Sequence, residues 1–132
     1  MTKTLVLMQG PPGSGKSTEA KKIAAATPGA VVVSADDYFI RYDGSYRFDP
    51  SSLADAHAAC RRAAERAMGE GAPMVIVDNT NIKRDHAASY LALAAFFGYE
   101  VEVNRCEGRY PNIHGVPQKK VAKMRKEMEV LS

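Results

Sequence analysis

The sequence predicts an α/β fold in which a parallel sheet of about four strands is flanked by helices. Short apolar runs rich in Val, Leu and Ile alternate with helix-compatible stretches, and glycine or proline marks their boundaries. Strands that alternate with helices form parallel sheets through right-handed crossovers. The chain has 132 residues, 45% hydrophobic and 25% charged, so we expect one compact domain over residues 1–132.

The first half of the chain predicts two strands and two helices. A strand over Thr4–Gln9 leads through glycines into a helix over Lys16–Ala26, which Pro28 and Gly29 end. The second strand lies in 30–34, where three consecutive valines, 31–33, are apolar on both faces, as in a strand covered on both sides. After the polar and aromatic stretch 36–48, which has no regular period, Asp49 is the expected cap of an Ala-rich helix that runs to about Met68.

The second half repeats the alternation. A buried strand over 73–77 ends at Asp78, and Asn81 is the expected cap of a helix over 82–97 that Gly98 ends. The alternation at 101–103 predicts a strand at the edge of the sheet. A loop over 106–115 precedes a last helix that starts at Val116 and runs to about Val130.

The composition indicates the cellular compartment and the classes of partner that we expect for this protein. The apolar run 5–8 is too short for a signal peptide, and no stretch approaches the ~20 apolar residues that span a bilayer. We therefore expect a cytoplasmic protein without a membrane partner. Cys60 and Cys106 are too few for a disulfide framework and are expected to be reduced. The formal net charge is +3, with a basic run at 119–126 that is either a solvated helix face or a contact for a polyanion.

Residues 10–17, GPPGSGKS, match the phosphate-binding pattern G-x-x-x-x-G-K-[ST] between a predicted strand and a predicted helix. In such a loop, backbone N–H groups and the helix N-terminus surround an anion. Thr18 stands where a dinucleotide fingerprint needs its third glycine, so the ligand is a nucleoside triphosphate. The predicted nucleotide-binding residues are Gly10, Pro12, Gly13, Ser14, Gly15, Lys16, Ser17 and Thr18.

Within this loop, Lys16 is expected to bridge the β- and γ-phosphates and Ser17 to offer its hydroxyl to Mg²⁺. Asp78, at the end of the third strand, is the second predicted metal residue, although a carboxylate there can also cap the next helix. Asp36 and Asp37 follow the second strand, so one of them can accept a proton from an acceptor hydroxyl. Paired acidic residues in this place are also common turn formers.

Phosphoryl transfer also needs cationic groups on a second side of the transferred phosphate. Arg105 and Arg109, before the last helix, are the candidates. The alternative interpretation of each is an ordinary surface arginine without a role in transfer. The acceptor's own phosphates need further cations, and the tyrosines around Gly44 can stack a base or pack the core. The predicted acceptor-side residues are Asp37, Arg41, Arg47, Thr80, Lys83 and Arg84.

The segments GPPGSGKST, SADDYF, VIVDNTN and NIHGVP together resemble the P-loop kinase domain of phage-type polynucleotide 5′-hydroxyl kinases. The likeness runs from Leu5 to Met128. It implies the P-loop NTPase/kinase fold with strand order 2-3-1-4, ATP and Mg²⁺ as donor, Asp36 as general base and a lid arginine on the transferred phosphate.

This sequence departs from the family pattern in three ways. Phe39 stands three residues after the base, where phage enzymes carry an arginine, and Arg41 is the nearest substitute. Pro111 precedes Asn112 in place of the family's arginine, which leaves Arg109 as the lid candidate. The stretch before Asn112 is also short.

The sequence thus predicts an ATP-dependent phosphotransferase acting on a hydroxyl, with the 5′-hydroxyl of DNA or RNA as the preferred acceptor. The alternatives are a kinase of a small alcohol such as a nucleoside, sugar or antibiotic, and a nucleotide-binding module that transfers nothing. Asp36 argues against the module and the basic tail against the small acceptor. The choice between DNA and RNA, the donor base and the oligomeric state are left open.

Overall fold

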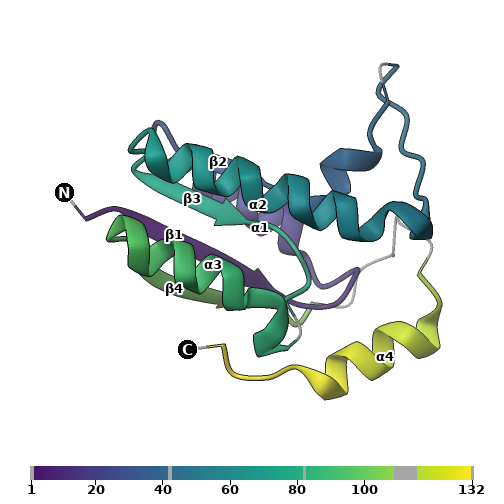
Figure 1. The fold of residues 1–132 in the computed structure, drawn as a ribbon. Coiled ribbons are helices and arrows are strands. Elements are labelled where there is room, and N and C mark those ends of the chain that lie inside the picture. Colours follow the sequence, from purple (N-terminus) through teal and green to yellow (C-terminus); the bar gives the residue numbers. More distant parts are fainter. Residues whose placement is uncertain (1, 42, 82, 109–115, 132) are drawn as a thin grey trace.

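The computed structural model describes residues 2–41, 43–81, 83–108 and 116–131. Within them a four-stranded sheet contains β1 (Thr4–Gln9), β2 (Val31–Val33), β3 (Met74–Val77) and β4 (Glu100–Arg105). The strand order is β2-β3-β1-β4 and all three pairings are parallel, which confirms the predicted architecture. In Figure 1 the arrowheads of the strands point the same way, toward the side where α4 (Gln118–Glu127) lies.

The register brings the ends of the strands to one edge of the sheet. Leu7 pairs with both Val77 and Val103, and Val33 pairs with Val77. The residues that follow β1, β2 and β3 therefore leave the sheet side by side. In a parallel sheet this carboxyl edge is where ligands bind.

Helices cover both faces of the sheet (Figure 1). Helix α1 (Lys16–Ala26) packs Ala20, Ile23 and Ala24 against Val6, Met8 and Ile76 on one face. Helices α2 (Leu53–Gly69) and α3 (Arg84–Phe97) cover the other face and enclose the larger apolar core. The side chains of β1 are almost completely buried, so this strand is the centre of the molecule.

The second strand is more exposed than the sequence predicts. Val31 and Val32 are 36% and 37% exposed, whereas Val33 is buried. The reason is the strand order, because β2 is an edge strand with β3 on one side only. The expectation of cover on both faces was wrong there, while the predicted edge position of β4 is confirmed.

Two helix starts also differ from expectation. Asp49 caps a short 3₁₀ turn, η2 (Pro50–Ser52), and α2 follows at Leu53. Asn81 does not cap α3, whose N-cap is Lys83. Instead, Asn81 is buried with a positive φ of 45°, and its side-chain amide donates to the carbonyl of Met8 at 2.8 Å. The residue therefore ties the end of β3 to the end of β1.

The last helix lies apart from the two layers that cover the sheet (Figure 1). The segment after it returns along the molecule, and there Leu131 is buried in the larger core. The side-chain amide of Gln9 donates to the carbonyl of Glu129, and Arg84 Nε donates to the carbonyl of Val130 at 2.8 Å. We call residues 128–131 the tail segment. No helix in the described ranges is both long and apolar enough to cross a bilayer.

Candidate active site

The loop between β1 and α1 is shaped for an anion. A Cβ at Gly10 would collide with Ser14 Oγ and the carbonyl of Cys106, so only glycine allows this close approach. Gly15 is the N-cap of α1 in the left-handed region (φ 91°), and no side chain among the described residues caps this helix. The first N–H groups of α1 are therefore left for a ligand, as in phosphate-binding helix termini.

A hydroxyl and a carboxylate meet beside this loop. Ser17 Oγ donates to Asp78 Oδ2 at 2.9 Å. The other oxygen, Asp78 Oδ1, is buried and has no hydrogen-bond partner in the described part of the chain. A buried carboxylate oxygen without a partner is costly unless something binds it. Hard oxygen donors of this kind fit Mg²⁺, which takes one or two protein oxygens and completes its shell with water and phosphate.

Lys16 lies at the same place. Its Nζ contacts the carbonyl of Pro11 at 3.5 Å. Burial lowers the pKa of the Lys16 ammonium, while the nearby carboxylates of Asp78 and Asp36 act in the opposite direction. A half-buried lysine that faces two carboxylates is well placed to bind a phosphate that enters between them.

Asp36, whose charge acts on Lys16, lies in the 3₁₀ turn η1 (Ala35–Phe39) that follows β2. Ser34 caps this turn by accepting from the N–H of Asp36 at 3.2 Å. The N–H of Ala35 donates to Asn79 Oδ1 at 2.8 Å, in a buried bond. The amide nitrogen of Asn79 contacts Cys60 Sγ at 3.5 Å and the Tyr90 hydroxyl at 3.4 Å. Asp36 lies on this turn. Through Asn79, which follows β3, the turn is attached to β3 and to helices α2 and α3.

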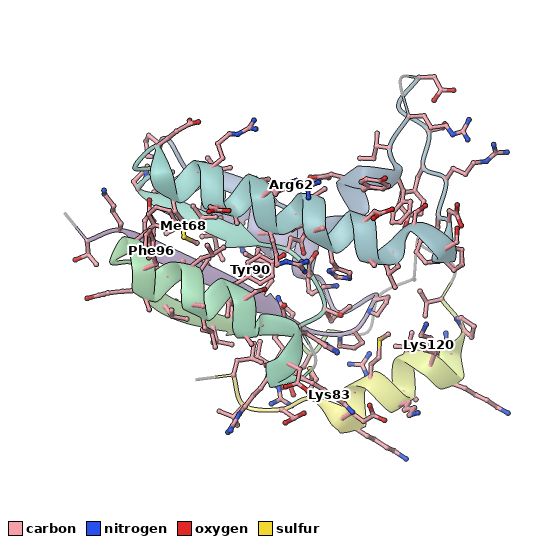
Figure 2. The ribbon with its side chains drawn as sticks, viewed as in Figure 1. Arg62, Met68, Lys83, Tyr90, Phe96 and Lys120 are labelled. Carbon is pink, nitrogen blue, oxygen red and sulfur yellow. The ribbon has the colours of Figure 1, made fainter. Side chains whose placement is uncertain are left out.

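Figure 2 shows Tyr90 on α3 on the side that faces α2, where this network lies. The network is buried, so its hydrogen bonds are shielded from water and hold the turn firmly. Asn79 itself is 9% exposed. The backbone adds a further bond between the same strands, from the N–H of Asp78 to the carbonyl of Val33 at 2.8 Å.

Lys16, Ser17, Asp36, Asp78 and Asn79 all line one cavity of about 210 Å³. The phosphate loop, the ends of β2 and β3, the segment 46–57 and α4 all contribute to its wall. The lining residues are Pro12, Lys16, Ser17, Ala35, Asp36, Tyr46, Phe48, Leu53, His57, Asp78, Asn79, Thr80, Val116, Lys120 and Met124. Six of the residues predicted from the sequence therefore meet here: Pro12, Lys16, Ser17, Asp36, Asp78 and Thr80.

Two neighbours of Asp36 have shifted acidities. Burial, together with the carboxylates of Asp36 and Asp78, raises the pKa of Asp37. Burial also lowers the pKa of His57, helped by the charges of Arg61 and His86 and opposed by Asp36. At neutral pH the His57 imidazole is therefore uncharged. It can give or take a hydrogen bond in the cavity without adding a cation.

A second cavity, of about 810 Å³, lies against the other part of the phosphate loop. It is lined by Ser14, Gly15, Thr18, Glu19, Lys21, Lys22, Asn104, Arg105, Cys106 and Gly108. Arg105 belongs to this cavity, and its Nε pairs with Glu107 at 3.2 Å. Asp36 does not line it. The structure therefore separates Arg105 from the space that holds Asp36.

The other predicted cations fall into three groups. Lys83 pairs with Glu127 of α4 at 3.6 Å, and Arg84 binds the tail segment (Figure 2 shows Lys83 beside α4). Arg41 and Arg47 are exposed on the hairpin over 40–48, which stands away from the body (Figure 1). Arg109 lies outside the described residues.

Four further residues of this site are not among the site residues predicted from the sequence. Tyr46 and Lys120 enter the sequence predictions only as members of a group, the tyrosines around Gly44 and the basic run 119–126, and His57 does not enter them. Asn79 did carry a signal, because it lies inside VDNTN, but the pattern does not tell which side chains of that segment face the turn after β2. The cation of Lys120 is contributed by α4 and adds positive charge to the wall of the cavity.

Comparison with known proteins shows the family and the fold of the chain. A family model described as an AAA domain matches residues 5–131. Human NEDD4-binding protein 2 is 34% identical over 129 residues, which are 91% of this chain and 7% of that protein. The chain thus spans a small part of this relative.

Solved structures share the fold. A structure of the Pnkp1/Rnl/Hen1 RNA repair complex matches with a TM-score of 0.70 and 16% identity over 96% of this chain and 44% of the matched chain. Mycobacterium tuberculosis APS kinase CysC in complex with AMPPNP and APS matches with a TM-score of 0.55 and 18% identity, covering 92% of this chain and 68% of that one. The chain therefore has the fold of P-loop kinases.

Proposed function

Because the chain belongs to the AAA domain family, which matches residues 5–131, we propose that it is an ATP-dependent kinase of a hydroxyl acceptor. The acceptor is the 5′-hydroxyl end of a nucleic acid. One observation carries the proposal: Lys16 of the phosphate loop and the carboxylate of Asp36 line the same cavity. Transfer of a phosphoryl group needs a donor site and a proton acceptor that face one space.

The donor side uses the loop and the end of β3. The N–H groups at the start of α1 and the Lys16 ammonium bind the β- and γ-phosphates of ATP. Ser17 and Asp78 would hold Mg²⁺, because Asp78 has a buried oxygen without a hydrogen-bond partner in the described part of the chain. Bound there, the metal ion supplies positive charge to the phosphate oxygens. The second cavity, beside Ser14 and Thr18, has room for the nucleoside.

The acceptor side uses Asp36. Its carboxylate takes the proton of the acceptor hydroxyl as that oxygen forms a bond to the γ-phosphorus and the bond to the β-γ bridging oxygen breaks. Asn79 and Ser34 hold the turn in place, so the carboxylate needs little reorganisation when the acceptor arrives. Lys120 supplies a cation from the far side of the cavity.

The surroundings of the cavity favour a polyanionic acceptor. Arg41 and Arg47 are exposed on the hairpin whose residue Tyr46 lines the cavity, and Lys120 extends from α4 on another side. Tyr46 and Phe48 add aromatic faces at the mouth, where a terminal base can stack. A nucleic acid end brings both phosphates and bases, whereas a sugar brings neither. The shared fold of the RNA repair complex supports the same acceptor.

Two of the cations predicted for the acceptor have another use. Lys83 and Arg84 bind α4 and the tail segment, so we assign the acceptor's phosphates to Arg41, Arg47 and Lys120 instead. Arg105 is assigned to the donor side because it lines the second cavity. The lid role stays a prediction for Arg109.

The test is phosphoryl transfer from γ-labelled ATP with Mg²⁺ to a panel of acceptors. The panel contains 5′-hydroxyl DNA and RNA oligonucleotides, nucleosides and sugars. We expect label on the oligonucleotide 5′ ends, and an apparent affinity that falls steeply as salt rises because phosphate contacts release counterions. Label on a nucleoside or sugar with no salt effect would establish a small-molecule kinase instead.

A matched pair of variants tests the base. Asp36→Asn removes the proton acceptor and should lower transfer by about 10²- to 10⁴-fold. Asp37→Asn changes the neighbouring carboxylate and should cost much less, because Asp37 does not line the cavity. Full transfer by Asp36→Asn to every acceptor would contradict the assignment. ATP binding without transfer to any acceptor would leave a nucleotide-binding module.

A further inference from the structure

A tyrosine hydroxyl lies on the proposed base. The Tyr46 hydroxyl donates to Asp36 Oδ1 at 3.2 Å, and both side chains line the 210 Å³ cavity together with Lys16. A hydroxyl that donates to this carboxylate makes the same kind of bond that an acceptor hydroxyl makes before transfer. Tyr46 therefore occupies a hydrogen-bonding position on Asp36 that the acceptor or a water molecule would otherwise use.

The hairpin holds this hydroxyl in place. Tyr46 pairs with Ile40 in an antiparallel bridge, and the N–H of Arg47 donates to the carbonyl of Phe39 at 2.9 Å. At the tip, the N–H of Arg41 donates to the carbonyl of Ser45 at 2.8 Å. The Tyr46 ring meets the buried Phe39 ring edge to face, with 6.2 Å between centroids. These backbone and ring contacts of Tyr46 do not involve its hydroxyl, so they remain when the hydroxyl is removed.

The Tyr46 hydroxyl also keeps its proton. Burial, and then the charge of Asp36 and the hydrogen bond to it, raise the pKa of Tyr46 to about 12. At neutral pH the group is a hydrogen-bond donor to the carboxylate and never a competing anion.

A kinase has to prevent its base from activating water. The same carboxylate that takes a proton from an alcohol can take one from water, whose oxygen then bonds to the γ-phosphorus while the β-γ bridging bond breaks. The products are ADP and inorganic phosphate, with the proton on the carboxylate. Kinases limit this loss by keeping the catalytic groups incomplete or dry until the acceptor is present.

We propose that Tyr46 determines this specificity: its hydroxyl occupies Asp36 when no acceptor is bound and yields that position to the acceptor hydroxyl. The proposal rests on the proposed function, since it assigns Asp36 as the base. The hairpin that carries Tyr46 also carries the exposed residues Arg41 and Arg47. The hydroxyl on Asp36 and two cations assigned to the acceptor therefore belong to one segment, which is how this proposal connects acceptor binding with release of Asp36.

The experiment measures phosphate release from ATP-Mg²⁺ without an acceptor, and transfer to the 5′-hydroxyl oligonucleotide, in the same preparations. Tyr46→Phe keeps the ring and removes the hydroxyl, so acceptor-free hydrolysis should rise by about 10-fold, a part of what a general base contributes. The ratio of acceptor-free hydrolysis to transfer should therefore rise, and the Tm should change little. Tyr38→Phe is the matched control, because Tyr38 also packs on Phe39 but does not line the cavity.

The double variant Asp36→Asn/Tyr46→Phe should return hydrolysis to the wild-type level, since the gain depends on the base. Hydrolysis by Tyr46→Phe equal to that of wild type would overturn the inference, and so would transfer of label to Tyr46 itself. A wild-type protein that phosphorylates no acceptor refutes the proposed function. A wild-type protein that phosphorylates the oligonucleotide, with unchanged hydrolysis in Tyr46→Phe, refutes only the role of Tyr46.

Discussion

The donor region and the acceptor region of this molecule are held in different ways. The phosphate loop follows β1, whose residues Leu5, Leu7 and Met8 are fully buried and lie between two other strands. The acceptor region is made from the hairpin over 40–48 and α4, which are largely exposed and come from separate parts of the chain. Asp36 lies between the two, on a turn that Asn79 attaches to the core.

The difference indicates which region sets the rate and which selects the substrate. Buried groups that are already in place stabilise developing charge without further reorganisation. Exposed cations contribute less interaction free energy to a bound phosphate, because water and salt screen their charges. Variants of the donor region should therefore lower the rate more than variants of the acceptor region.

Among variants of the donor and acceptor regions themselves, the largest expected effect is that of Lys16→Ala. Loss of one positioned donor to a developing charge costs about 10²- to 10³-fold in kcat. Single-turnover transfer from labelled ATP at saturating donor measures this loss, with circular dichroism to confirm folding. Lys126→Ala, on the exposed part of α4, is the control and should retain full activity. A loss below about threefold would show that the loop binds phosphate through its backbone alone.

The next effect is one of stability, at the junction between the two regions. Asn79→Ala leaves the N–H of Ala35 without its partner in a buried place, which costs about 1 to 3 kcal/mol of unfolding free energy. Urea unfolding measures the change, and Ser89→Ala on the exposed part of α3 should be nearly neutral. Transfer by folded Asn79→Ala should fall as well, because the turn that carries Asp36 is less well held. Unchanged stability would mean that water replaces the amide.

The smallest effect belongs to Lys120→Ala. Because Lys120 is exposed while it lines the cavity, we expect a rise of about 3- to 10-fold in KM for an oligonucleotide and a salt slope smaller by about one. Affinity for ATP should not change. Lys119→Ala is the control on the same helical turn. If Lys120→Ala lowered kcat as much as Lys16→Ala, the distinction between the two regions would fail, and α4 would belong to the catalytic machinery.

Most of the fold and half of the site could be predicted because their causes are local. The loop pattern is contiguous, and its glycines, Lys16 and Ser17 act through the helix they begin. Asp36 and Asp78 could be brought to the loop because parallel strands end at one edge. The strand order followed from the resemblance and is confirmed.

The rest of the site depends on contacts between distant segments. Tyr46, His57 and Lys120 line the cavity from a hairpin and two helices. The spacing of these residues in the sequence does not predict how the three elements are arranged relative to one another. Lys83 and Arg84 were predicted to bind the acceptor because of their charge alone. In the structure, their side chains bind α4 and the tail segment. Asn81 has the composition of a helix cap, but its bond to Met8 is formed only after β1 and β3 are paired.

The tail segment makes the two regions mechanically dependent on each other. Gln9, whose side chain holds the carbonyl of Glu129, is the residue immediately before Gly10. Arg84 holds the next carbonyl, and Leu131 anchors the segment in the core. A displacement of α4 is therefore expected to reach the first glycine of the phosphate loop through the tail segment and Gln9, by a route outside the cavity in which the chemistry takes place.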